Sequence, residues 1–201
     1  MKKIDDGEYK SLFLGKGNVL HEKAYEIAND TRKFEIDNYW KRANYYWLFQ
    51  TAVYGGYFYS VTAKWDKNLC KHPEYIIVGI TCLGFLTALA WLFSNIGSKQ
   101  WQKNWESHVD MLEDGIAGPL YKVGIHEKTW SVSKINEIVS GFSVIAWILL
   151  GIETVCSFFS CTLLIAYLAV LCIIASPFYF YGRKGLGDRD KEIQWFKKGE
   201  E

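Results

Sequence analysis

Two long stretches without charge constrain what this chain can fold into. Residues 75–98 and residues 154–182 contain no Asp, Glu, Lys or Arg. A helix rises about 1.5 Å per residue, so the hydrocarbon core of a bilayer, roughly 30 Å thick, takes about 20 apolar residues to cross. Both stretches are long enough, and neither shows the polar positions at helical period that a helix of a soluble bundle would carry. They predict two membrane-spanning helices.

Two weaker stretches complete the predicted membrane domain. Residues 43–63 are uncharged but rich in aromatic side chains and interrupted by Gln50, and residues 135–152 carry Glu137 near their start. Two buried helices of a soluble bundle are the alternative for this pair. Half of all residues are apolar, yet the mean hydropathy is only -0.04, because charge is confined to other segments. We predict an all-α, four-transmembrane-helix membrane protein with cytoplasmic helical extensions, and we expect it to be oligomeric.

The distribution of basic residues orients these spans. Most Lys and Arg residues lie before residue 43, between the second and third spans, or after residue 182. The positive-inside rule places such segments in the cytoplasm. The first forty residues are charged and lack an apolar stretch before a small-residue cleavage site, so no signal peptide is expected. Both termini are therefore predicted to be cytoplasmic.

This orientation divides the chain into five predicted segments. They are a cytoplasmic N-terminal arm and amphipathic helix (1–42), transmembrane helices one and two (43–96), a cytoplasmic helix extension and return loop (97–133), transmembrane helices three and four (134–182) and a cytoplasmic tail (183–201). Ser131 or Ser133 suits the N-cap of the third span. Pro177 is expected to kink or end the fourth.

Helical periodicity continues outside the membrane-crossing stretches. Residues 1–17 lack a clear period, so we expect a loosely ordered arm. Asn18 suits an N-cap, and an apolar stripe follows at spacings of four and three: Leu20, Ala24, Ile27, Thr31 and Phe34. The stretch "GSKQWQKNWESHVDMLED" (97–114) carries a second stripe: Trp101, Trp105, Val109 and Leu112. Because an amphipathic helix must bury its stripe, we expect the two to pack together in a cytoplasmic layer, with each helix continuous with its span.

Motifs for catalysis or metal binding are not recognisable. "HEKAY" (21–25) begins like the zinc-protease signature, but Tyr25 stands where the second histidine must be. "HEKTW" (126–130) fails in the same way, and both are expected at the surface. We predict no enzyme activity, no cofactor and no metal site. The five cysteines include no CxxC pair, and Cys70 could form a disulfide with Cys156 or Cys161 on the outer face.

One ionisable residue is predicted inside the membrane domain. Glu137 lies about one turn into the third span, beside Asn136, and an ionisable group at this depth usually faces a bundle interior or a wet cavity. Around an oligomer axis a ring of Glu137 would attract cations. Glu137, Asn136 and Gln50 are therefore the candidate pore-lining residues. Alternatively, Glu137 lies among the headgroups and pairs with Lys134.

Basic residues lie next to aromatic ones on the predicted cytoplasmic side. Single-stranded nucleic acids bind such surfaces through base stacking and phosphate attraction, but an interfacial aromatic belt with positive-inside lysines has the same composition. A net charge of +1 gives no general nucleic-acid footprint, so a ligand site must be local. The candidate ligand- or partner-binding residues are Arg32, Lys33, Lys99, Trp101, Lys103 and Trp105.

Part of the chain resembles a group of defence proteins. "NYYWLFQTA" (44–52) and "WLFSNIGSKQWQKNWESHVDMLED" (91–114) are similar to segments of small four-span membrane effectors of bacterial anti-phage defence, such as the Hailong effector and the membrane component of Kiwa. The likeness covers residues 39–121 and is most specific at 97–106. It implies an oligomer with an ion-channel-like membrane domain and a cytoplasmic portion that controls opening. The ligand would be a single-stranded DNA oligomer in a Hailong-type effector and a protein in a Kiwa-type system.

Two hypotheses of function follow. The first is an oligomeric ion-channel-like effector, with a tetramer favoured, in the bacterial inner membrane. A ligand bound in the cytoplasm, for which a single-stranded DNA oligomer is one candidate, would open it and cause depolarisation or host cell death. The second is a non-conducting membrane scaffold that recruits a soluble defence protein through its cytoplasmic helices, with Trp101 and Trp105 in contact. Both imply membrane lipid and further copies of the chain as partners.

Overall fold

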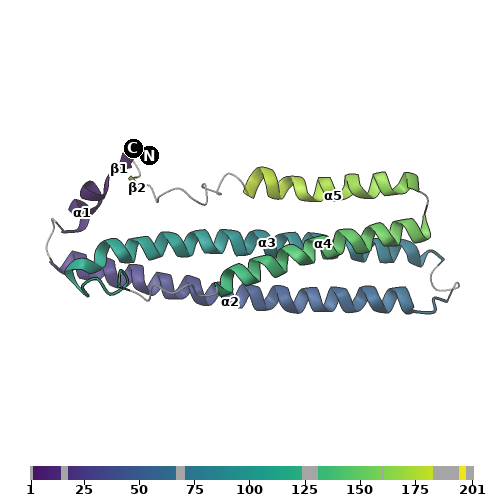
Figure 1. The fold of residues 1–201 in the computed structure, drawn as a ribbon, viewed down its shortest axis with the longest axis horizontal. Coiled ribbons are helices and arrows are strands. Elements are labelled where there is room, and N and C mark those ends of the chain that lie inside the picture. Colours follow the sequence, from purple (N-terminus) through teal and green to yellow (C-terminus); the bar gives the residue numbers. More distant parts are fainter. Residues whose placement is uncertain are drawn as a thin grey trace. The chain divides into compact units, whose positions relative to one another are not determined.

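The chain is helical apart from one pair of short strands (Figure 1). The computed structural model describes residues 2–14, 18–66, 71–123, 131–159, 161–182 and 195–197. Its elements are β1 (Lys2–Ile4), α1 (Asp6–Leu14), α2 (Asn18–Thr62), α3 (Pro73–Leu112), the 3-10 turn η1 (Glu113–Gly115), α4 (Val132–Phe158), α5 (Cys161–Gly182) and β2 (Trp195–Lys197). β1 and β2 pair antiparallel. The predicted all-helical class is confirmed, with this strand pair as an addition.

Contacts divide the chain into two compact units. The first unit comprises the described parts of Met1–Tyr39, Ser98–Trp130 and Leu186–Glu201, and the second comprises those of Trp40–Gly97 and Ser131–Gly185. α2 and α3 contribute residues to both units, whereas α4 and α5 belong to the second alone. Because α2 is one helix from Asn18 and α3 ends only at Leu112, the predicted continuation of both helices beyond their uncharged stretches is confirmed.

Two helices in the described part of the chain are long and apolar enough to cross a membrane. They cover Pro73–Gly115 and Val132–Phe158, and Leu163–Tyr179 forms a shorter apolar helix. The stretch of α2 that corresponds to the predicted first span is not apolar enough by the same measure. Its polar residues are the reason, and their contacts are described below.

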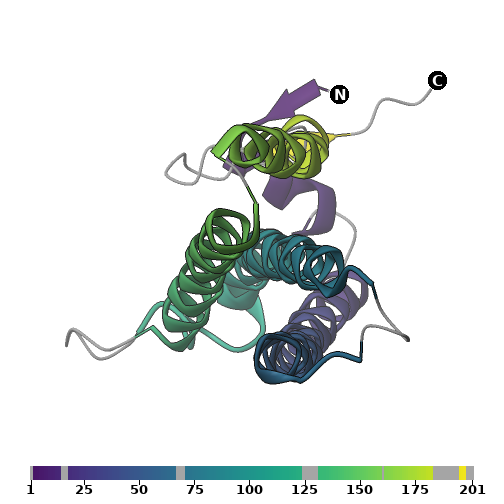
Figure 2. The ribbon, with the colours of Figure 1, turned by 90° about the vertical axis from the view of Figure 1, so that its right-hand side faces the viewer.

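The second unit is a bundle of helices around a buried tryptophan. Figure 2 views these helices along their length, with α5 on one side, α2 on the opposite side, and α3 and α4 between them. Trp147 of α4 is fully buried among Tyr57, Phe85, Ala88 and Tyr167, which come from α2, α3 and α5. A Cβ atom on Gly84 of α3 would lie 2.3 Å from the Trp147 ring. Gly84 thus allows α3 and α4 to approach closely.

The first unit has a small core of its own. Its buried apolar residues are Tyr9 of α1, Ala28 of α2, and Val109 and Leu112 of α3. Packing of the α2 and α3 extensions on each other is therefore confirmed. The expectation of a loosely ordered arm is wrong for residues 6–14, because Asp5 Oδ1 accepts a hydrogen bond from the Glu8 amide at 2.6 Å and so caps α1.

The face of α2 that packs in the first unit differs from the predicted stripe. His21 and Ala28 are buried, whereas Ile27 and Phe34 are 54% and 60% exposed. On α3 the predicted stripe holds from Trp105 to Leu112 but not at Trp101, which is 58% exposed. Ala24, which belongs to the predicted stripe, packs against this core beside Ala28, whereas the larger Ile27 and Phe34 of the same stripe stay exposed.

Several local expectations can be compared with the structure. Ser131 is the N-cap residue of α4, in agreement with one of the two predicted caps. α5 continues past Pro177 to Gly182, so the helix does not end there. Cys156 is a free thiol, while Cys70 and the side chain of Cys161 lie outside the described residues. The "HEKTW" segment also lies outside them.

Candidate functional site

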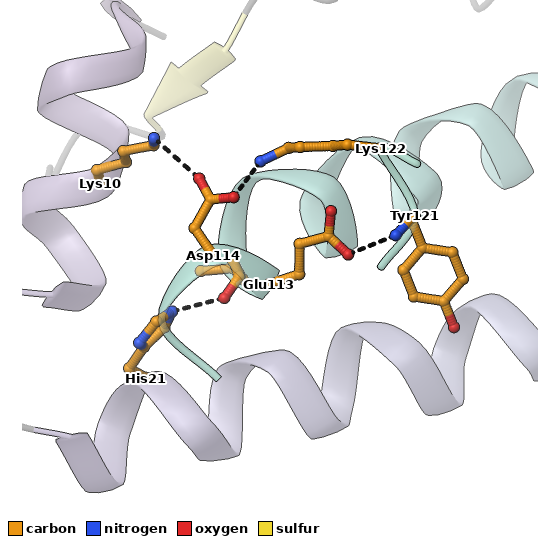
Figure 3. Close-up of polar contacts among 7 residues, drawn as sticks. Lys10, His21, Glu113, Asp114, Tyr121 and Lys122 are labelled. Atoms are coloured by element: carbon orange, nitrogen blue, oxygen red, sulfur yellow. Dashed lines mark hydrogen bonds and ion pairs between the residues drawn. The ribbon is translucent and has the colours of Figure 1, made fainter. Parts of the chain in front are cut away.

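A group of polar contacts closes the C-terminal end of α3 in the first unit (Figure 3). The Nε2 atom of His21 lies 2.7 Å from the Leu112 carbonyl oxygen, one of the carbonyls that a helix leaves without an intrahelical partner. A Cβ atom on Gly115 would lie 2.8 Å from Cε1 of His21. His21 was expected at the surface, and that expectation is wrong, because its ring supplies a hydrogen bond that the end of α3 needs.

Glu113 fixes the loop that follows α3. Glu113 is 0% exposed, and its Oε2 accepts a hydrogen bond from the Tyr121 amide at 2.9 Å. Its Oε1 has no hydrogen-bond partner in the described part of the chain. The Arg32 guanidinium lies 4.9 Å from the centre of the Tyr121 ring, so a cation on α2 covers the same loop. Sequence reasoning missed Glu113, since a carboxylate next to Asp114 gives no sign of burial.

A surface ion cluster joins α1 to this loop. The Asp114 carboxylate contacts Lys122, and its other oxygen lies 3.5 Å from Lys10 Nζ on α1. The hydrogen bond from Lys122, more than the one from Lys10, lowers the pKa of the Asp114 carboxyl. The hydrogen bond to Asp114 in turn raises the pKa of Lys122. These side chains are substantially exposed, so we expect them to contribute little stability.

Tyr9 and His108 connect α1 to α3 more deeply. The Tyr9 hydroxyl oxygen lies 2.6 Å from His108 Nδ1, and the His108 ring lies 5.3 Å from that of Trp105. Burial raises the pKa of Tyr9 above its usual range and lowers the pKa of His108. Both groups are therefore held neutral near pH 7, which lets the Tyr9 hydroxyl donate to an unprotonated Nδ1.

We expect the first unit to lose stability as the pH falls through the range in which His108 titrates. The folded pKa of His108 lies below its ordinary value, about 6.5, so the unfolded chain binds the proton first. The contribution of His108 to the stability of the first unit is complete above about pH 6.5 and is lost as the pH falls through the folded pKa of His108. Asp114 acts in a separate, more acidic window, below about pH 3.9. Thermal unfolding followed by tryptophan fluorescence at several pH values measures this. His108→Gln should weaken the dependence of the unfolding midpoint on pH. An unchanged dependence in that variant would assign the effect to another group.

In the second unit, Gln50 of α2 is the centre of a buried polar network. It is 3% exposed. Its Nε2 donates to Thr87 Oγ1 at 2.9 Å and to the Gly84 carbonyl at 3.3 Å. Its Oε1 accepts from Trp147 Nε1 at 2.7 Å and from Ser143 Oγ at 3.1 Å. One amide therefore connects α2, α3 and α4.

A second polar pair joins α3 to α4. Asn136 Nδ2 donates to Asn95 Oδ1 at 3.1 Å, and Asn95 Nδ2 donates to Ser140 Oγ at 3.2 Å. Asn95, Asn136 and Ser140 are buried. Gln50 and Asn136, both candidates for lining a pore, thus lie inside the helix bundle of a single protomer. Their amides hydrogen-bond to neighbouring helices, which leaves the half-buried Glu137 as the remaining candidate.

The structure separates the six candidate ligand-binding residues. Trp105 packs against the core of the first unit, and Arg32 lies over the Tyr121 ring. Lys33 pairs with Asp30 at 3.5 Å on its own helix, and Lys99 Nζ lies 3.4 Å from Gln102 Oε1. Trp101 and Lys103 are exposed on α3. Lys33 is exposed as well, but its ammonium group is paired with Asp30, so Trp101 and Lys103 are the exposed candidates outside that ion pair.

Comparison with known protein families gives a match over most of the chain. A family model described as the octameric membrane protein family (8xMP) matches residues 22–157, a range that takes in most of α2 and all of α3 and nearly all of α4. Neither the curated proteins nor the solved structures contain a match to this chain.

Proposed function

The chain belongs to the octameric membrane protein family, and on that premise we propose that it forms an ion-conducting assembly in the bacterial inner membrane. The octameric character of the family favours eight copies over the four that we expected from the sequence. Opening of the assembly would depolarise the cell, as in the anti-phage effectors that residues 39–121 resemble. The first unit and both termini would lie in the cytoplasm, in keeping with the positive-inside rule.

The observation that carries this proposal is that α2 and α3 each contribute to both units. A ligand that binds the first unit better in one arrangement of these helices would shift the population toward that arrangement. The shift would then reach the second unit along the same two helices. A single-stranded DNA oligomer and a soluble protein are the two candidate ligands, and Trp101 and Lys103 are the first residues to examine.

The contacts of α2 support its assignment as a membrane span in addition to α3, α4 and α5. Several of the groups that lower its hydropathy have partners within the chain. Gln50 bonds to α3 and α4, and the hydroxyl of Tyr57 lies 3.1 Å from Thr154 Oγ1. Thr51 and Thr62 donate to carbonyls of their own helix. A polar group is tolerated in hydrocarbon when it is satisfied in this way, so α2 is compatible with a bilayer despite its composition.

We expect Glu137→Gln to lower the preference for cations severalfold while leaving the assembly intact. A ring of carboxylates at a pore mouth raises the local cation concentration, and the amide removes that charge. Reversal potentials in planar bilayers under a salt gradient measure the preference. Glu153→Gln, at the other end of α4 and exposed, is the matched control. Unchanged selectivity in Glu137→Gln would remove Glu137 from the pore.

The complete test of the proposal uses the wild-type protein. Native mass spectrometry counts the subunits, and liposomes loaded with a potential-sensitive dye report conduction with and without short single-stranded DNA. Eight copies with conduction would support the proposal. An octamer that conducts under no condition, yet loses a bound protein on Trp101→Ala, would favour the scaffold, to which the exposed Trp101 ring is suited.

A further inference from the structure

We propose that one exposed face of α2 is a contact surface for a second copy of the chain. This face, the α2 seam, follows a seven-residue spacing through Leu20, Ile27, Phe34, Lys41, Leu48 and Gly55. The proposal rests on the proposed octamer and specifies which part of the protomer contacts a neighbour.

In the first unit, the seam is an apolar line that the core does not use. Ile27 and Phe34 are 54% and 60% exposed, although they lie on a helix whose neighbouring residues include the exposed Glu22, Lys23 and Glu26. The described α2 side chains buried in this unit are His21, Ala28 and Tyr39, on a different face. Apolar side chains at regular spacing on a charged helix are typical of a second contact face.

In the second unit, the same spacing reaches residues that leave room for another helix. Leu48 is 70% exposed, and Ala52 and Gly55 are exposed as well. A Cβ atom on Gly55 would meet nothing within 4 Å. Small residues at such positions allow two backbones to approach closely in a membrane. Lys41 occupies the seam position between Phe34 and Leu48, and its long side chain can extend to lipid headgroups.

The pattern selects a copy of the chain as the occupant. Residues seven apart lie on nearly the same side of a helix, so the seam presents one continuous side of α2 to a neighbour. Lipid alone would not require the apolar residues Leu20, Ile27 and Phe34, which precede the uncharged stretch of α2. A soluble partner would not require Leu48 and Gly55, which lie within the uncharged stretch of α2. A second copy carries both kinds of segment, and the family match covers the seam from residue 22 onward. In a closed ring the seam would meet a different surface of its neighbour.

Photo-crosslinking of the full-length protein in membranes tests this inference. A benzophenone amino acid replaces Phe34 in one variant and Leu48 in another, and the same residue replaces Leu120, which is comparably exposed but off the seam, as the control. We expect both seam positions to give an adduct of twice the chain mass, at several times the yield of the control. Peptide mapping identifies the partner and the surface that it presents.

The other outcomes separate this inference from the proposed octamer. If native mass spectrometry shows eight copies but both seam positions crosslink only to lipid, to another protein or to nothing, the seam inference is overturned and the octamer stands. If the wild-type chain is monomeric, the octamer itself fails. As a second measurement, Ile27→Asp with Phe34→Asp should yield smaller assemblies with unchanged helix content, while Leu120→Asp stays octameric. Intact octamers in the double variant would contradict the inference.

Discussion

Gly84→Ala is expected to destabilise the second unit, because the added Cβ would lie 2.3 Å from two carbon atoms of the Trp147 ring. The ring has little freedom to move away. It stacks on Tyr54 with 4.3 Å between centroids, and its Nε1 donates to Gln50. Overpacking of this kind costs about 1 to 3 kcal/mol. Thermal unfolding in detergent, followed by size-exclusion fluorescence, should show a clearly lower midpoint than that of the wild type.

Gly79→Ala is the matched control for this experiment. It adds the same methyl group to the same helix, but a Cβ there would meet nothing within 4 Å. We expect it to melt like the wild type or slightly higher, since alanine favours a helix over glycine by about 1 kcal/mol. Equal midpoints for the two variants would mean that Trp147 does not fill the space beside Gly84.

The helices themselves were predictable because their determinants are local. A long uncharged apolar stretch has few alternatives to a helix, and nothing after residue 96 stops α3 before Gly115. Asn18 marks the start of α2 in both the sequence and the structure. The short helix α1 was missed because it depends on a single cap at Asp5 and on contacts of Tyr9 with α3, which lies about a hundred residues away in the sequence.

The choice of packing face was not predictable from periodicity. A helix of an oligomer carries more than one apolar line, and the pattern does not tell which one is covered within the protomer. On α2, sequence reasoning assigned the stripe through Leu20, Ala24, Ile27, Thr31 and Phe34 to the core, and of these Ala24 packs against it. The structure instead covers the line through His21 and Ala28. The number of subunits is equally non-local, because it depends on the angle between two surfaces of the folded chain.

The polar residues of the predicted spans were recognised, but their partners were not. A glutamine or asparagine in a membrane helix must find a hydrogen-bonding partner, which a wet pore or a neighbouring helix can supply equally well. The sequence does not distinguish these environments, since the partners of Gln50 lie 34 to 97 residues away. Burial decides between them. It assigns Gln50 and Asn136 to helix packing and leaves Glu137 as the candidate for contact with ions.

Gln50→Ala should therefore destabilise the bundle rather than alter conduction. The variant leaves Trp147 Nε1 and Ser143 Oγ without their shared acceptor and opens a cavity beside Gly84. Unpaired buried groups cost about 1 to 3 kcal/mol each in soluble proteins, and a hydrogen bond in a bilayer averages about 0.6, so we expect a loss of about 1 to 4 kcal/mol. Thermal unfolding measures this loss, with Thr51→Ala as the control, because the Thr51 hydroxyl donates to the Trp47 carbonyl of its own helix at 2.9 Å. Reversal potentials of the assembled fraction should match those of the wild type. A stable Gln50→Ala assembly with altered ion selectivity would instead return Gln50 to the conduction path.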